Sequence, residues 1–266
     1  MKNHRKKKIS FLANFVLDEI CQNGLVDLHA IANYEELPVH YDHYESNTFD
    51  GMLVYHNSKF HIHINVDKGN TSNSRRGRFT LAHELGHYLI DEHRIALKYG
   101  FMTAHQSKNS LLNKDLIEQE ADYFASCLLL PEKQFRLACA KKQFSIDLMI
   151  NLSDQFYVSL MAAILRFIEI GSREFMIVVS KSGIVRWFSK STDFAKLKFR
   201  FNVGHSLPND SISCKYACIV DRDFTTNIEE VDTDTWFYNS YYPLLVYEQC
   251  YYSQINGYLI TLVWFS

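Results

Sequence analysis

The chain has 266 residues, of which 47% are hydrophobic and 22% are charged, and its formal net charge is −2 at pH 7. This composition is that of a folded globular protein with one or two domains, and it excludes an intrinsically disordered chain. The small net charge also disfavours a protein that coats nucleic acid. The six cysteines contain no C-x-x-C pair, which predicts reduced, mostly buried thiols in a cytoplasmic protein.

The first segment combines a basic lead-in with an apolar stretch. Five of residues 2–8 are Lys or Arg, and residues 9–17 are mostly apolar, as in the first two regions of a signal peptide. However, Asn14 interrupts the apolar run, and no small-x-small cleavage site follows promptly. The apolar residues instead recur at helical spacing, so we expect an amphipathic helix. Because no segment approaches the roughly 18 apolar residues of a membrane span, we expect no membrane partner.

Two strands are expected at residues 52–56 and 59–66. In the second strand, apolar residues alternate with polar ones, which is the pattern of a half-buried strand. The polar positions include His61 and His63. A solvent-exposed sheet face explains these two histidines better than a metal site does.

The next segment, residues 80–89, contains the motif H-E-x-x-H. On a helix, His83 and His87 lie four residues apart on one face, where both imidazoles can bind a single cation. Glu84 lies about 100° around the same helix and could take a proton from a metal-bound water. Two neutral nitrogens, an acidified water and a base are the components of a metallopeptidase site. Gly86 inside this buried helix suggests that another backbone approaches it closely.

A second helix is expected over residues 116–131, with a buried apolar stripe and Pro131 at its end. Its small residues Ala121 and Ala125 would let it approach Gly86. Glu118 borders the stripe, and such a carboxylate suits a metal ligand.

Three residues are candidates for the third ligand. His93 follows His87 by six residues, as in a second class of zinc enzymes, but that geometry needs a sharp turn where the β-branched Ile90 stands. Glu120 lies on the opposite shoulder of its helix. Glu118 shares a face with Asp122, which could orient a ligating histidine. We therefore expect His83, His87 and Glu118 to bind the metal, with Asp122 behind them.

These segments resemble the ImmA/IrrE family of metallo-endopeptidases. The resemblance rests on residues 60–65, on residues 80–89 and on residues 117–131, which match E-x-x-A-x-x-F-A-x-x-L-L-x-P with Glu118 at its first position. One departure is Asp91, where family members often carry a histidine. The resemblance implies a thermolysin-like zinc site and cleavage of a helix-turn-helix repressor in stress response or mobile-element control.

The rest of the chain shows no catalytic motif. Helices expected at residues 144–151 and 159–170 have a helix-turn-helix layout, but the second offers little that could contact base edges, so direct nucleic-acid binding is disfavoured. From residue 171 the sequence is rich in strand patterns, including residues 212–220 and 242–264. We interpret Cys214 and Cys218 as alternating strand residues. The predicted domains are a zincin-like metallopeptidase domain (1–135), a helical segment (136–170) and a β-rich domain (171–266). For the β-rich domain, sensing of a signal, recruitment of substrate and plain structural support are the alternatives.

The predicted fold class is thus α+β, with a thermolysin-like zincin domain, a helical extension and a β-rich C-terminal domain. The predicted function is that of a Zn²⁺-dependent endopeptidase with Glu84 as general base, and Mn²⁺ is an alternative metal. A DNA-binding or protein-interaction regulator with a structural or vestigial metal site is the alternative. The oxyanion donor stays open among Tyr88, His105 and Tyr123, and the sequence does not indicate the oligomeric state.

Overall fold

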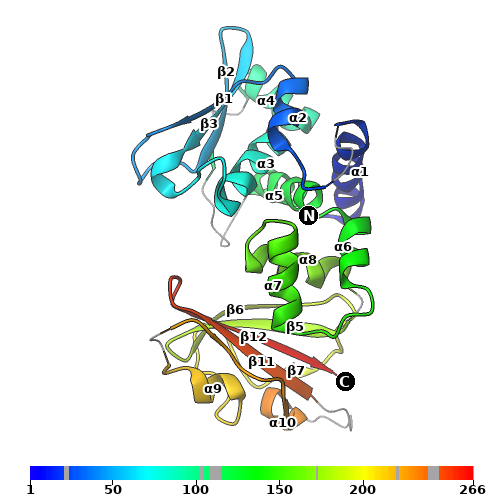
Figure 1. Ribbon diagram of the computed structural model, residues 1–266, viewed down its shortest axis with the longest axis vertical. Helices are drawn as coiled ribbons and strands as arrows, with labels where there is room; N and C mark the ends of the chain where they lie inside the picture. Colours follow the sequence, from blue (N-terminus) through cyan, green and yellow to red (C-terminus); the bar gives the residue numbers. More distant parts are fainter. Residues whose placement is uncertain are drawn as a thin grey trace. The chain divides into compact units, whose positions relative to one another are not determined.

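The computed structural model describes residues 1–20, 24–101, 115–171, 173–219, 222–238 and 246–265, together with the backbone of residues 105–107 (Figure 1). Helices and sheets occur together, which confirms the predicted α+β class. The chain forms two compact units. The first comprises Met1–Ala138 with Leu152–Ala162, and the second comprises Cys139–Asn151 with Ala163–Ser266. The three functional domains expected from the sequence stay a prediction.

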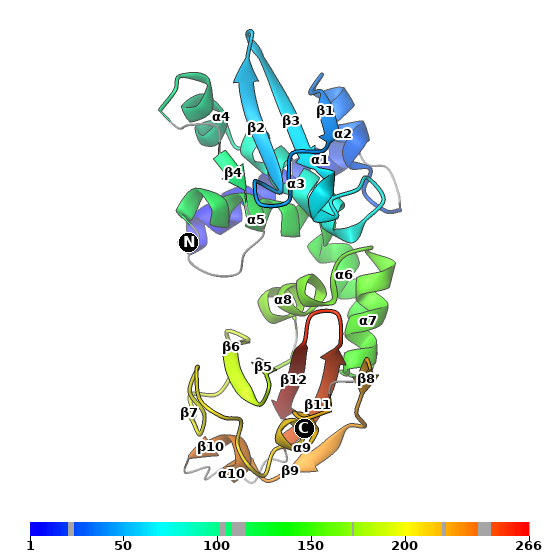
Figure 2. The same cartoon turned by 90° about the vertical axis from the view of Figure 1, so that its left-hand side faces the viewer.

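The first unit combines helices with one four-stranded sheet, which is seen beside these helices in Figure 2. The strands run in the order β1-β3-β2-β4, with β1 parallel to β3 and β2 antiparallel to both of its neighbours. The two strands expected at residues 52–56 and 59–66 are confirmed as β2 and β3. The elements that lie wholly in this unit are α1 (Asn3–Ile20), α2 (Leu28–Tyr34), β1 (Val39–Asp42), β2 (Gly51–His56), β3 (Lys59–Asn65), the 3-10 helix η1 (Val66–Lys68), α3 (Arg75–Leu89), α4 (Asp91–Lys98), β4 (His105–Ser107) and α5 (Leu116–Leu129).

One face of this sheet is buried and the other is polar. Leu53, Ile62 and Ile64 are almost completely buried, and α3 packs against β2 and β3. On the opposite face, His40 of β1 lies beside His63 of β3. The alternation predicted for the second strand therefore matches a sheet with one face on the core.

The helix that carries H-E-x-x-H is fixed at both its start and its middle. Ser74 caps α3, since its hydroxyl accepts a hydrogen bond from the backbone N–H of Gly77. At Gly86, an added Cβ would lie 3.2 Å from the carbonyl oxygen of Ala121 and 3.1 Å from the ring of Phe124. The glycine thus allows α5 to cross α3 closely, as the sequence predicted.

The next helices contain the points where the chain passes between the two units. They are α6 (Glu132–Cys139), α7 (Ile146–Gln155) and α8 (Leu160–Ile170). Within the described residues no single helix has the length and apolar character to cross a bilayer. Among the described helices, α7 and α8 pass that test together, as a pair bent by 106°.

The second unit is organised around an antiparallel sheet in the order β6-β5-β12-β11-β8, with β9 also paired to β11. Strands β7 and β10 form a separate pair. Trp236, Phe237 and Val263 belong to its main cluster of buried side chains. The elements are β5 (Phe175–Lys181), β6 (Ile184–Lys190), β7 (Lys198–Phe199), α9 (Ile212–Tyr216), β8 (Phe224–Thr225), β9 (Glu229–Val231), α10 (Thr233–Trp236), β10 (Phe237–Tyr238), β11 (Val246–Ser253) and β12 (Tyr258–Phe265).

The strand expected at residues 212–220 is wrong, because Ile212–Tyr216 is the helix α9. Ser211 caps this helix by accepting a hydrogen bond from the N–H of Cys214. The buried carboxylate of Glu248 accepts from the N–H groups of Ile212 and Ser213. These contacts override the strand preference of the segment. The interpretation of Cys214 and Cys218 as alternating strand residues is therefore also wrong, because Cys214 lies in α9 and Cys218 in the turn that follows it.

Candidate metal centre

Two helices bring three metal-binding side chains together. Helix α3 provides His83 and His87, and α5 provides Glu118. The Nε2 atoms of the two histidines are 3.0 Å apart. Glu118 places Oε1 3.0 Å from His87 Nε2 and Oε2 3.5 Å from His83 Nε2. All three side chains are buried. Their ligand atoms lie within 4.8 Å of one another, and among the described residues they form the group that could hold a metal ion.

The distances within this group fit a divalent cation. Zn²⁺ binds imidazole nitrogen at about 2.0–2.1 Å, which places two ligand atoms of a tetrahedral site about 3.3–3.4 Å apart. The observed spacings of 3.0 to 3.5 Å lie around that value. Two imidazoles and one carboxylate are also a known ligand set of catalytic zinc. The residues therefore fit the ion that the motif implies.

Asp122 lies behind His83, where the sequence predicted it. Its Oδ1 atom is 2.9 Å from His83 Nδ1, so His83 can donate from Nδ1 while Nε2 points toward Glu118. Burial disfavours the charged imidazole, yet the hydrogen bonds to Asp122 and Glu118 outweigh burial and raise the pKa of His83 to about 10. Burial lowers the pKa of His87 to about 4, against the effect of Glu118.

Glu84 is completely buried and faces the start of β2. A Cβ atom at Gly51 would lie 2.7 Å from Glu84 Oε1 and 2.6 Å from Thr80 Cγ2. The carboxylate of Glu84 therefore rests against the bare backbone of Gly51. A sequence pattern could not reveal this contact, because it joins residues that are 33 positions apart and depends on how α3 docks on the sheet.

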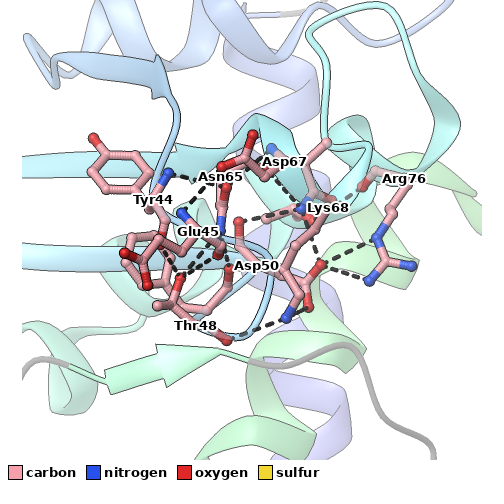
Figure 3. Close-up of polar contacts among 11 residues, drawn as sticks. Tyr44, Glu45, Thr48, Asp50, Asn65, Asp67, Lys68 and Arg76 are labelled. Carbon is pink, nitrogen blue, oxygen red and sulfur yellow. Dashed lines mark hydrogen bonds and ion pairs between the residues drawn. The ribbon is translucent and has the colours of Figure 1, made fainter.

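A polar network holds the segment before Gly51 in place (Figure 3). The buried carboxylate of Asp50 accepts a hydrogen bond from Arg76 Nη2 at 2.6 Å and pairs with Lys68 Nζ at 3.3 Å. The buried amide of Asn65 donates to the carbonyl oxygens of Glu45 and Phe49. These contacts tie the loop before β2 to the first turn of α3. The network therefore fixes the place of Gly51 relative to Glu84.

Two residues considered as third ligands lie behind His87 instead. His93 Nδ1 is 3.2 Å from His87 Nδ1, and His93 Nε2 is 3.1 Å from Glu120 Oε2. Glu120 in turn accepts a hydrogen bond from Arg5 Nη2 at 2.6 Å. Sequence reasoning missed this arrangement. The spacing of six residues after His87 singled out His93, but nothing in the basic lead-in singled out Arg5.

The other candidates lie elsewhere. His40, His61 and His63 gather on the outer sheet face, with His40 Nε2 3.3 Å from His61 Nδ1. The ring of Tyr88 contacts that of Phe60. Lys6 Nζ lies over the ring of Tyr123 at 4.9 Å. The side chain of His105 lies outside the described residues, so no oxyanion donor is assigned.

The fold and the site define a mixed α+β domain with an H-E-x-x-H helix and a His–His–Glu group that could bind a metal ion. Residues 46–167 match the family model described as the IrrE N-terminal-like domain, Peptidase_M78. This match supports the predicted resemblance to the ImmA/IrrE family, a metallopeptidase-like family, for this part of the chain.

One solved structure supports the fold assignment over most of the chain. It is described as a Mycobacterium tuberculosis transcriptional regulator, and the similarity covers 97% of this chain and 76% of that one, with a TM-score of 0.62 and 13% identity. At this identity the similarity shows a shared fold alone. No curated protein gives a significant match.

Proposed function

We propose that the protein is a zinc-dependent endopeptidase with a thermolysin-like zincin site. The observation that carries the proposal is the convergence of His83, His87 and Glu118, with their ligand atoms within 4.8 Å of one another, beside the buried Glu84 on the same helix. Mn²⁺ is an alternative metal, because carboxylate and imidazole ligands also suit it. The family match over residues 46–167 supports the same class.

The chemistry follows from the side chains. A bound zinc ion would supply a Lewis acid that lowers the pKa of a water molecule to about 7. His83 and His87 would present neutral Nε2 atoms to it, and Asp122 would hold the His83 ring in the required orientation. Glu84 would accept the proton from the attacking water and deliver it to the leaving amine.

The proposed substrate is a helix-turn-helix transcriptional repressor, cleaved in stress response or mobile-element control. This part of the proposal rests on the family resemblance. In the same proposal residues 1–135 form the peptidase domain, residues 136–170 a helical extension, and residues 171–266 a module that senses a signal or recruits the substrate.

A pair of variants tests the proposal. We expect Glu84→Gln to lose hydrolysis of purified helix-turn-helix repressors by about 10²–10⁴-fold, the usual contribution of general-base catalysis, while it keeps stoichiometric metal. The amide matches the carboxylate in shape but cannot accept the proton. Glu118→Gln should lose most bound metal, because a neutral amide is a poorer ligand than a carboxylate. Metal analysis and cleavage assays on the same preparations distinguish the two outcomes.

Two results would contradict the proposal. Substantial cleavage by Glu84→Gln, with contaminating protease excluded, would show that Glu84 is not the base. Metal binding by the wild type without any cleavage would instead favour a regulator with a structural metal.

A further inference from the structure

A chain of polar side chains leads from His87 to the N-terminal helix. His87 Nδ1 contacts His93 at 3.2 Å, His93 contacts Glu120 at 3.1 Å, and Glu120 contacts Arg5 at 2.6 Å. The four residues come from α3, α4, α5 and α1 respectively (Figure 1). His87 and His93 are 1% and 3% exposed and Glu120 is 5% exposed, so water has little access to this chain.

We propose that His93, held by Glu120 and Arg5, is a positioning residue that fixes the ring orientation and tautomer of His87 for metal binding. The inference rests on the proposed metal site and adds to it a second support, independent of Asp122. It also gives α1 and α4 a role in the metal centre, although neither helix supplies a ligand.

The proton positions along this series of four side chains follow from their contacts. A histidine that binds a metal through Nε2 carries its proton on Nδ1, so His87 donates from Nδ1 to His93. His93 Nδ1 must then be the acceptor, and its proton lies on Nε2, where it can be donated to Glu120. Every hydrogen bond therefore runs in one direction, toward a carboxylate that the Arg5 guanidinium stabilises.

The two ligating histidines would thus be supported in different ways. His83 contacts a carboxylate, Asp122, directly at 2.9 Å. His87 reaches its carboxylate, Glu120, through the intervening ring of His93. Such support holds a ligand in one tautomer and one rotamer, and its removal usually weakens metal binding about 10–100-fold.

Two substitutions separate positioning of His87 from simple packing. In His93→Asn, an amide oxygen attached to Cγ takes the place of Nδ1 and can still accept from His87. In His93→Gln, the amide lies one bond farther out, near the former Nε2, and serves Glu120 instead. Both side chains are polar and smaller than histidine. His93→Leu provides neither contact.

The experiment is a Zn²⁺ titration against a competing chelator, with the Co²⁺-substituted proteins compared by visible absorption. We expect His93→Gln and His93→Leu to bind Zn²⁺ about 10–100-fold more weakly and to alter the Co²⁺ spectrum, while His93→Asn stays close to the wild type. Glu92→Gln is the matched control. It removes the other carboxylate partner of Arg5, whose Nη1 lies 2.8 Å from Glu92 Oε1, and leaves the contact between His93 and Glu120 in place.

Equal weakening in the Asn and Gln variants, or wild-type affinity in both, would overturn the inference. Circular dichroism and thermal unfolding show whether each variant is folded. The comparison of His93→Asn with His93→Gln tests the inference even where His93→Leu does not fold. Failure of the wild type to bind Zn²⁺ at all would instead overturn the proposed function, and this inference with it.

Discussion

The side chain of Glu84 and the backbone of Gly51 occupy adjoining space, and no atom fits between them. An alanine at position 51 would place Cβ 2.7 Å from Glu84 Oε1 and 2.6 Å from Thr80 Cγ2. We expect Gly51→Ala to lower the free energy of unfolding by about 1–3 kcal/mol, the usual cost of overpacking, and to displace the carboxylate that serves as the proposed base. Urea denaturation and the cleavage assay measure the two effects.

The double variant Gly51→Ala with Thr80→Ser is the control for Gly51→Ala. Serine removes Cγ2 and keeps the hydroxyl that donates to Asn70 Oδ1 at 2.9 Å. Stability should therefore recover in part, whereas cleavage should not, because the contact with Glu84 remains. Normal cleavage by Gly51→Ala would show that Glu84 does not depend on this contact.

At the residue scale, the sequence indicates local relations better than distant ones. The spacing of His83, His87 and Glu84 follows from helical geometry, and so does the pairing of Glu118 with Asp122 on α5. The structure brings the His83, His87 and Glu118 ligand atoms together. In contrast, the contacts of Gly51 and Arg5 join separate elements and leave no periodic signal.

At the element scale, the crossing of α3 and α5 sets the distance between the two histidines and Glu118. The two helices approach each other closely at Gly86, where an added Cβ would meet the Ala121 backbone at 3.2 and 3.3 Å. We expect Gly86→Ala to weaken Zn²⁺ binding, because α5 would have to move away by a few tenths of an ångström. This is expected even though alanine favours helix by roughly 1 kcal/mol. Chelator competition measures the affinity.

Adding Phe124→Leu to Gly86→Ala identifies the contact responsible. The new Cβ would also lie 3.1 Å from Phe124 Cδ1, and leucine relieves that contact while the backbone contact with Ala121 remains. Persistent weak binding in the double variant would assign the effect to the helix crossing. Unchanged affinity in Gly86→Ala alone would show that the crossing can relax without disturbing the ligands.

Elements with strong periodicity were predictable, and an element held by tertiary contacts was not. The alternation of β3 and the apolar stripe of α5 are visible in the sequence. Helix α9 is not, because a strand-like segment becomes helical where Glu248 accepts its first N–H groups. The acceptor, Glu248, lies more than 30 positions away from these N–H groups in the sequence.

At the scale of the whole molecule, the chain passes from the first unit to the second at the end of α6, returns to the first unit inside α7, and passes to the second unit again inside α8. Phe144 packs against Phe167, Phe175 and Trp264 within the second unit. A chain ending near residue 170 would therefore expose Phe144 and Phe167. Single substitutions are thus the better way to examine the second unit.

Glu248 offers such a substitution. Its completely buried carboxylate accepts hydrogen bonds from Ile212 N at 3.1 Å, Ser213 N at 2.7 Å and Trp236 Nε1 at 3.0 Å. Glu248→Ala leaves these donors without the carboxylate, so we expect the free energy of unfolding of the second unit to fall by about 2–4 kcal/mol. All three tryptophans belong to the second unit, so tryptophan fluorescence reports its unfolding. The Zn²⁺ affinity of the first unit should not change.

The pH dependence gives an independent check on Glu248, with Glu248→Gln as the reference. Burial raises the pKa of this carboxyl in the folded protein, although the hydrogen bonds from Ser213, Trp236 and Ile212 oppose the shift. The folded state therefore binds the proton more tightly than the unfolded chain, whose glutamates titrate near pH 4.3. The stability advantage of wild type over Glu248→Gln should be greatest below that pH and should decline as pH rises through the folded pKa. A growing advantage would mean that the hydrogen bonds outweigh burial and that the folded pKa is lowered.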